Sequence, residues 1–383
     1  MIKGALQVEL EAYWGIKSVA SSKTKTITAA AFCLARKKFS HQAFIDIRDV
    51  LTHEVYQSGF AKTWRGHRLL AVDGSALTLP ITAETMSHFG LANGHAKHPT
   101  LRISQLYDVL NQQTVDFKHS SFSTGERELA LQHASYLQDN DLVLYDRGYY
   151  SAWLFALHIQ RKTHCCMRMK AASELVSEAF GESSKREVII DLTFPKASRK
   201  HCKALNIPLE KINARLIKIT LATGETEVLM TSLIDRKKYP IQLFQELYHQ
   251  RWAIEEDYKL MKSRMEFENF TGKSSESILQ DIYAKLVTKN IAAVIALETE
   301  LAAGKNQKPL NNRTKANMSY VISTLKYRIV NLIMLPRATV DLLAEIIRLC
   351  GKQMYKPRLN RVFERQMTKM HKRKYFYSYK RTT

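Results

Sequence analysis

Residues 67–79 read HRLLAVDGSALTL, and this stretch decides the fold. Its apolar residues Leu69 to Val72 run directly into Asp73, which a Gly-Ser pair follows. A short apolar run that ends at turn residues predicts a strand buried on both faces, as in α/β proteins. An acid that ends such a strand lies at the sheet edge where the sites of α/β proteins form. The stretch therefore predicts an α/β core, with Asp73 as a candidate site residue.

A second stretch of the same kind lies further along the chain. Residues 141–151, DLVLYDRGYYS, again place an apolar strand directly before an acid, Asp146. Residues 102–110 and 113–122 have the composition of two more strands, joined near Asn111. Either acid taken alone is more often a turn or cap residue than a site residue. Two acids that end two buried strands, however, can meet at one sheet edge.

The remaining periodicity predicts a helical start, a mixed α/β centre with an inserted β element, and a helical end. Residues 171–238 look mostly β and include a hairpin that turns at 222–225. The expected parts are a helical N-terminal region at 1–66, a first part of the α/β core at 67–170, a β-rich insertion at 171–238, a second part of the core at 239–303, a C-terminal helical region at 304–350 and a basic tail at 351–383.

Residues 246–270, ELYHQRWAIEEDYKLMKSRMEFENF, predict one helix with two stripes. The polar stripe spans an arc of about 60–80° at about 100° per residue; its members are Tyr248, Arg251, Glu255, Lys259 and Lys262. The apolar stripe can face a sheet; its members are Leu243, Leu247, Ile254 and Met261. Glu256 lies about 100° from Glu255 and is expected to point elsewhere. In most helices a polar stripe is a solvated face with i,i+4 ion pairs.

Glu255 joins Asp73 and Asp146 in a set of three carboxylates on two strand ends and a helix. Such a cluster repels itself unless cations lie among its members. Mg²⁺ takes oxygen ligands and keeps several waters, so two or three carboxylates suffice to hold it. Two such ions can stabilise the attacking and the leaving oxygen of a phosphoryl transfer. The cations beside Glu255 would then hold phosphates near the metal ions.

The charge of the chain points to the same kind of partner. Its 383 residues contain 58 Lys and Arg against 36 Asp and Glu, a net charge of +22, so nucleic acid is the first candidate partner. The tail 351–383 has eleven Lys and Arg and one acid, which predicts either a solvated tail or a DNA-backbone contact. Five scattered cysteines without a CxxC pair argue against a disulfide framework and a structural zinc site. No apolar run approaches the roughly 18 residues of a membrane span, so we expect a soluble, intracellular protein.

These motifs resemble those of a known family. AVDGS at 71–75, LYDRGYY at 144–150 and the spacing Y-x2-R-x3-E-x6-K are similar to the DDE transposases of bacterial insertion sequences, in the insertion sequence four group. Residues 228–262 and 31–44 are similar to that family as well, and the resemblance covers about residues 25–300. It implies a ribonuclease H-like mixed sheet flanked by helices. The acids would lie on the first strand, the fourth strand and a following helix, with the β-rich insertion before the last acid.

The resemblance also implies roles for individual residues. The catalytic residues and ligands of Mg²⁺ or Mn²⁺, with two ions expected, would be Asp73, Asp146 and Glu255. The residues that contact transposon-end DNA would be Tyr248, Arg251 and Lys262. Further candidates for DNA contacts, beside these motif positions, are Arg147 and Lys259.

The implied activity is metal-dependent cleavage at the terminal inverted repeats of a transposon, followed by attack of the freed 3′-hydroxyl on target DNA. The implied partners are double-stranded DNA and, once two ends are bound, a second copy of the chain. The implied location is the bacterial cytoplasm, at the nucleoid. A metal-dependent nuclease or a domesticated, non-mobile relative would carry the same motifs. A basic DNA-binding protein with an inactive site is a third hypothesis.

The chain departs from the family in two places. Longer members have an N-terminal DNA-binding segment before the region that matches GALQVEL at 4–10, so we expect this chain to begin inside that segment. Some relatives use a Trp in the insertion to stabilise a flipped base when a DNA hairpin forms. No Trp lies within 171–245, so a hairpin route through such a Trp is not expected.

Overall fold

The chain folds into two compact units that alternate along the sequence. The sheet unit comprises Ala61–Ala76 and Leu101–Tyr258, and the helical unit comprises Met1–Phe60, Leu77–Thr100 and Lys259–Thr383. The structure is a computed structural model, and it describes residues 6–18, 27–93, 95–181, 184–221, 224–304, 314–334 and 339–356.

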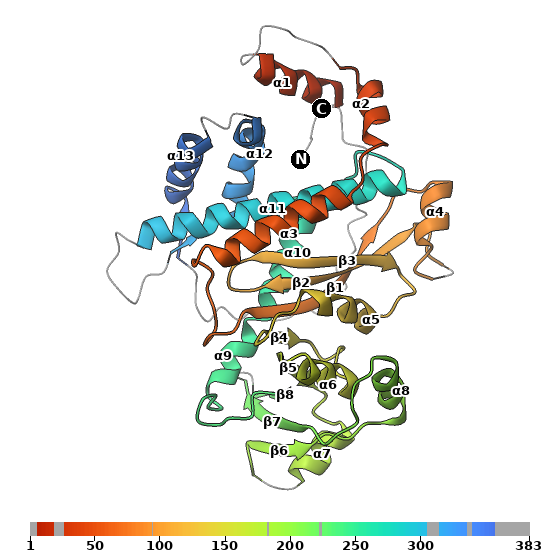
Figure 1. Cartoon of the computed structure of the whole chain (residues 1–383), viewed down its shortest axis with the longest axis vertical. Helices are drawn as coiled ribbons and strands as arrows, with labels where there is room; N and C mark the ends of the chain where they lie inside the picture. Colours follow the sequence, from red (N-terminus) through yellow and green to blue (C-terminus); the bar gives the residue numbers. More distant parts are fainter. Residues whose placement is uncertain are drawn as a thin grey trace. The chain divides into compact units, whose positions relative to one another are not determined.

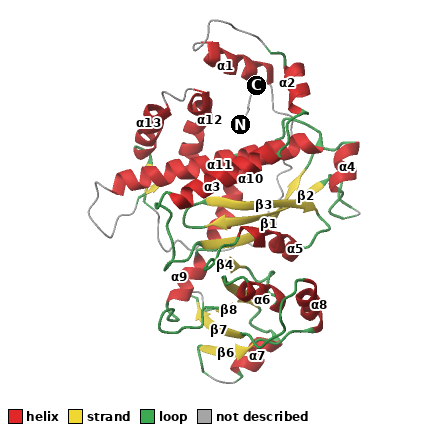
Figure 2. Ribbon diagram, viewed as in Figure 1, coloured by secondary structure: helices red, strands yellow, loops and turns green. Residues whose placement is uncertain are grey.

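One eight-stranded sheet, in the order β3-β2-β1-β4-β5-β8-β7-β6, is the frame of the sheet unit (Figure 2). Its strands are β1 (Leu69–Thr78), β2 (Thr100–Asp108), β3 (Gln113–Ser121), β4 (Leu142–Tyr145), β5 (His164–Met169), β6 (Glu187–Asp191), β7 (Asn213–Thr220) and β8 (Thr226–Thr231). β1, β4 and β5 run parallel. β2 pairs antiparallel with β3, and the pairs from β5 to β6 are antiparallel as well. The sheet is therefore mixed, with a parallel centre.

The apolar runs that precede the two candidate acids form this parallel centre. The four residues from Leu69 to Val72 have no solvent exposure, and those from Leu142 to Tyr145 have at most 2%. Their register is Leu69 with Leu142 through Val72 with Tyr145. Burial on both faces explains why both runs are apolar without alternation.

The sheet unit also carries a set of short helices. They are α5 (Glu126–Gln132), the 3₁₀ turn η1 (His133–Tyr136), α6 (Ala152–Gln160), α7 (Glu174–Phe180), α8 (Lys196–Ala204), α9 (Leu243–His249) and most of α10 (Trp252–Ser263). The expectation that residues 171–238 are mostly β misses α7 and α8. The strands of that segment are present, and they extend the core sheet through the pairing of β8 with β5.

The prediction of one continuous helix over 246–270 is wrong. α9 ends at His249 and α10 begins at Trp252. Between them the backbone N–H of Arg251 donates to the carbonyl of Tyr248, three residues earlier rather than four. Such a 3₁₀ turn is tighter than an α-helix and changes the direction of the side chains that follow. The turn contains neither Gly nor Pro, so the composition carries no signal for the break.

The helical unit is built around the long helix α11 (Ser275–Gly304). Its other elements are α1 (Leu6–Ser18), α2 (Ala29–Arg36), α3 (Gln42–Gln57), α4 (Ala83–Phe89), α12 (Met318–Met334), α13 (Thr339–Gly351) and the short pair β9 (Lys315–Ala316) and β10 (Met354–Tyr355). α3 lies along α11, and α12 and α13 pack against it as well (Figure 1). In the described part of the chain, no helix combines the length and apolar character needed to cross a bilayer.

This architecture confirms the predicted fold class. A large mixed sheet carries helices, and the acid at 73 lies on the first strand while the acid at 146 follows the fourth. The helical regions expected before and after the core are present as well. Most of the basic tail, from residue 357 onward, lies outside the described residues.

Candidate active site

Asp73 and Asp146 lie side by side where the pairing of β1 with β4 ends. The expectation that Asp73 ends its strand is wrong, because β1 continues to Thr78, whereas Asp146 directly follows β4. The parallel register of β1 and β4 ends at the pair Val72 and Tyr145, and each acid is the next residue of its chain. Because the two strands run parallel and in register, the two acids occupy neighbouring positions just beyond the paired stretch. The structure thus brings together two acids that lie 73 positions apart in the sequence.

A tight turn holds Asp146. Its Oδ1 accepts a hydrogen bond of 2.8 Å from the backbone N–H of Gly148. A Cβ at residue 148 would lie 3.1 Å from that oxygen, which is closer than ordinary contact and explains the Gly. Arg127 of α5 donates from Nε and Nη2 to the carbonyl oxygen of Gly148, at 3.0 and 2.8 Å. The turn that carries the second acid is therefore fixed by hydrogen bonds from both sides.

Glu255 of α10 reaches the same edge through Arg251. The Nη2 of Arg251 donates to Oε1 of Glu255 at 2.5 Å, and its Nη1 lies 3.9 Å from Oδ2 of Asp73. The Arg251 side chain is 7% exposed, against 21% for Asp73 and 31% for Glu255. One buried guanidinium therefore lies between two of the three acids. Its Nε is buried, and no described residue accepts a hydrogen bond from it.

Two tyrosines attach α9 and α10 to β4 and β1. The hydroxyl of Tyr258, on α10, donates to the backbone carbonyl of Asp73 at 2.9 Å. The hydroxyl of Tyr248, on α9, donates to the carbonyl of Tyr145, the last residue of β4, at 3.2 Å. Each helix is thus attached to the residue at, or just before, one of the aspartates. Tyr258 is a site residue that the sequence analysis missed, although an aromatic residue three positions after Glu255 could have suggested it.

The acids interact electrostatically in the folded chain. Burial, with a smaller contribution from the charges of Asp146 and Glu255, raises the pKa of Asp73 to about 6, against the opposing effects of the Gly74 N–H and Arg251. Burial, together with the charges of Asp73 and Asp146, also raises the pKa of Tyr149. The Tyr149 hydroxyl is buried and makes no hydrogen bond to any described residue. Arg251 therefore compensates only part of the negative charge at this edge.

The donor set fits a hard divalent cation, because all three side chains offer carboxylate oxygens. Among the residues that the structure describes, no three His, Cys, Asp or Glu side chains are arranged closely enough to hold a metal ion. The charges of Asp146 and Glu255 nonetheless raise the pKa of Asp73, and the guanidinium of Arg251 approaches both Asp73 and Glu255.

The predicted DNA-contacting residues have different surroundings. Tyr248 and Arg251 are buried, and their polar groups face the strand ends and the acids. Arg147, next to the second acid, is exposed. Lys259 and Lys262 follow Glu255 on α10, where both are exposed and both belong to the helical unit. Contact of these residues with DNA stays a prediction.

A buried acid on the other side of α10 is a second feature that the sequence analysis missed. Asp257 is 6% exposed, and its Oδ2 accepts a hydrogen bond of 2.8 Å from Nε2 of Gln105 on β2. Tyr107, on the same strand, also bonds to Asp257. On the helical wheel Asp257 lies about 180° from Tyr248, at the border of the apolar stripe, which is the available signal. The contact attaches α10 to the sheet through polar groups.

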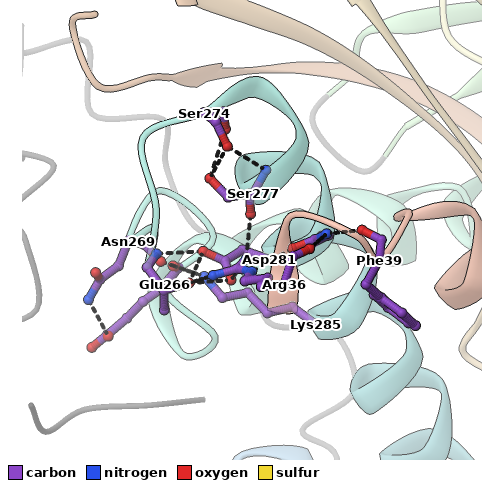
Figure 3. Close-up of polar contacts among 10 residues, drawn as sticks. Arg36, Phe39, Glu266, Asn269, Ser274, Ser277, Asp281 and Lys285 are labelled. Carbon is purple, nitrogen blue, oxygen red and sulfur yellow. Dashed lines mark hydrogen bonds and ion pairs between the residues drawn. The ribbon is translucent and has the colours of Figure 1, made fainter. Parts of the chain in front are cut away.

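The segment that follows α10 is held within the helical unit (Figure 3). The Nζ of Lys285, on α11, donates to the carbonyls of Glu266 and Asn269 at 2.7 and 2.8 Å. Burial lowers the pKa of Lys285 to about 8, while Asp281 and Glu266 raise it. Arg36, the last residue of α2, donates to the Ser277 carbonyl at 2.7 Å and to Asp281 at 2.9 Å. The segment after α10 is therefore attached to α11, and the start of α11 is attached to α2.

Comparison with known proteins agrees with this geometry. The transposase DDE domain family matches residues 64–291. The chain is 26% identical over 271 residues to the transposase InsG for insertion sequence element IS4 of Escherichia coli (strain K12). That alignment covers 65% of this chain, and the chain spans about 59% of the length of this curated relative.

Among solved structures, the chain resembles the piggyBac transposase in its cryo-EM synaptic complex with hairpin DNA. The TM-score is 0.42 and the identity 10%, over 73% of this chain and 57% of that chain. The family match extends from before β1 to the middle of α11 and includes all three acids. Because it covers more than half of the sequence, the chain belongs to the DDE transposase family, and the resemblance predicted from its motifs is confirmed.

Proposed function

We propose that the chain is a DNA transposase that cuts DNA at the ends of an insertion sequence and joins the freed ends to target DNA. The observation that carries the proposal is that Asp73 and Asp146 lie just beyond the paired stretch of β1 and β4 and that the charges of Asp146 and Glu255 both act on Asp73. Membership of the DDE transposase family supports the same reaction class.

The three acids would hold two divalent cations, Mg²⁺ or Mn²⁺. Carboxylate oxygens are the donors that these cations prefer. Burial and neighbouring negative charge raise the pKa of Asp73. A bound cation would lower this pKa, because it favours the ionised carboxylate. When bound, the cations would polarise the scissile phosphoryl group and stabilise the attacking and leaving oxygens.

The chain's own residues would orient this site. Arg251 keeps a fixed positive charge between Asp73 and Glu255 and would compensate part of their negative charge. Tyr258 and Tyr248 would keep the catalytic helix in register with the strand ends, because each donates to a backbone carbonyl there. Precise orientation of this kind matters since small displacements of reacting groups are costly in rate.

Exposed cations near the motif would bind the DNA backbone. Arg147, Lys259 and Lys262 are exposed, and the whole chain carries a net charge of +22. The DNA partners would be the terminal inverted repeats and the target duplex. Two copies of the chain would act together when two ends are brought to one target.

The test is an end-cleavage and joining assay with the full chain. Short inverted repeats in the DNA that flanks the coding sequence supply the substrate duplex. The proposal predicts Mg²⁺- or Mn²⁺-dependent cleavage that frees a 3′-hydroxyl at the repeat end, followed by its joining to a second duplex. Cleavage without joining would support a metal-dependent nuclease instead. Binding without any cleavage would support a DNA-binding protein with an inactive site.

A further inference from the structure

The helix α8 carries a row of four cations on one face. Its sequence, KASRKHCKA, places them at positions i, i+3, i+4 and i+7, and α8 contains no acid. The row consists of Lys196, Arg199, Lys200 and Lys203. At about 100° per residue they lie within an arc of about 100°. All four side chains are exposed. We call this row the α8 basic stripe.

The opposite face of α8 is anchored to α6, which lies beside it (Figure 1). Ser198 and Cys202 are buried, and Cys202 has no solvent exposure. The ring of His201 stacks on that of Trp153 of α6, with centroids 5.0 Å apart and an angle of 23°. Nε2 of Gln160, at the end of α6, donates to the carbonyl of Asn206 at 2.9 Å. The stripe is therefore displayed on a fixed support rather than on a loose surface helix.

Two other cations of the same segment pair with acids, whereas the stripe has no acidic partner among the described residues. Lys211 lies 3.6 Å from Asp191, and Arg215 pairs with Glu187. No described Asp or Glu lies within ion-pair distance of any stripe residue; Arg199 donates only to the carbonyl of Phe194, at 2.8 Å. Like charges at i,i+4 destabilise a helix. The stripe therefore opposes the folding of α8, and a bound polyanion would remove that penalty.

We propose that the α8 basic stripe binds the phosphate backbone of duplex DNA, at a place distinct from the carboxylate site. This inference rests on the proposed function, in which DNA is the substrate. From i to i+7 the stripe is about 10 Å long, roughly the length of three phosphates along one strand. Phosphate contacts position a protein on DNA without reading its sequence. The stripe would therefore hold DNA that flanks the cleavage point, whatever its sequence.

The test replaces all four stripe residues with Gln in the full chain, which keeps helix-forming side chains and removes the charge. Binding is measured on a duplex without transposon-end sequence, over a range of salt concentrations. We expect weaker binding and a slope of log K against log salt that is smaller by up to about 2.7, since the stripe spans about three phosphates and each phosphate contact contributes about 0.9. The thermal midpoint should be unchanged or higher, because like-charge repulsion within α8 is removed.

Lys211→Gln is the matched control, because Lys211 is an exposed cation whose charge Asp191 already balances. It should leave the salt slope unchanged. A fourfold variant with the wild-type affinity and slope would overturn the proposal. So would a variant that binds DNA normally but loses binding to polyglutamate, since the stripe would then serve an acidic protein. If the wild-type chain binds duplex DNA but never cuts a repeat end, the proposed function is contradicted. The role of the α8 basic stripe is still decided by the binding test, because that test does not depend on cleavage.

Discussion

Arg251 is the residue on which the charge balance of the site depends. It is buried between Asp73 and Glu255, and it opposes the rise in the pKa of Asp73. The i,i+4 pairing of Arg251 with Glu255 could be predicted from spacing. Its approach to Asp73 could not be predicted, because it depends on how α10 is docked on β1. Both aspartates could be predicted, because each ends a run of buried apolar residues.

The raised pKa of Asp73 makes a prediction about stability. Its folded pKa of about 6 lies above the unfolded value near 3.9. The folded chain therefore binds the proton more tightly, and wild-type stability should fall as pH rises from about 4 to 6. Asp73→Asn lacks this loss and should be more stable than wild type at pH 7, by on the order of 2 kcal/mol, in the presence of a chelator. Urea unfolding from pH 4 to 7 measures this difference in the free energy of unfolding. The prediction is contradicted if the wild type becomes more stable relative to Asp73→Asn as pH rises.

Arg251→Ala and Lys262→Ala test whether the polar stripe serves DNA. We expect slower or misplaced end cleavage that excess DNA partly restores, because a lost charge-assisted contact costs roughly 1.5–3 kcal/mol. That cost corresponds to about one to two orders of magnitude in rate if the contact acts in the transition state. Cleavage rate against DNA concentration is the measurement, with Lys211→Ala as the control cation. Near-wild-type curves for both variants would show that neither side chain positions DNA; Lys262, which is exposed, would then belong to a solvated face, where ion pairs contribute about 0–1 kcal/mol.

At the scale of elements, the strands were predictable and the helix boundaries were not. Apolar runs and strand-like composition predicted β1 to β4, and the hairpin of β7 and β8 was predicted as well. The break between α9 and α10 has no Gly or Pro to mark it, and it arises from tertiary docking. α8 was missed because four of its nine residues are the stripe cations and its buried positions are only Ser198 and Cys202.

The contact between α10 and β2 should be as important as the acids for the position of Glu255. Asp257→Ala leaves the buried Nε2 of Gln105 without its acceptor, so the free energy of unfolding should fall by about 1–3 kcal/mol. Cleavage should slow as well, because α10 loses a bond that sets its rotation. Denaturant unfolding and single-turnover cleavage measure the two effects. Glu256→Gln, an exposed neighbour, should stay within about 0.5 kcal/mol of wild type; equal effects of both variants would contradict this role for Asp257.

At the scale of the whole molecule, the chain is divided into two units in a way that no local pattern reveals. The helical unit takes residues from the start, from between β1 and β2, and from the end of the chain. A division of the sequence into an N-terminal region, a core and an insertion does not describe these units, because each unit combines stretches that are separate in the sequence. Composition does predict one property of the whole molecule. The net charge of +22 and the basic tail predict a DNA partner.

The basic tail makes a prediction at this scale. Residues 357–383 contain nine Lys and Arg and one acid, and deletion of this segment keeps the pairing of β10 with β9. The deletion should weaken binding to any duplex and flatten its salt dependence, because phosphate contacts release counterions. A filter-binding titration at several salt concentrations measures this. An unchanged salt slope would show that the tail does not bind DNA.

The central claim is that Asp73, Asp146 and Glu255 form one metal-dependent catalytic site. The most direct measurement is Mg²⁺- or Mn²⁺-dependent end cleavage by the three single Ala variants, with DNA binding measured in parallel and Glu256→Ala as the control. Loss of any one carboxylate should abolish cleavage, because each is a ligand of the cations, while affinity for DNA, which comes mainly from Lys and Arg, should persist. Glu256→Ala should keep most of its activity. Cleavage that survives Glu255→Ala but is lost in Glu256→Ala would contradict the claim.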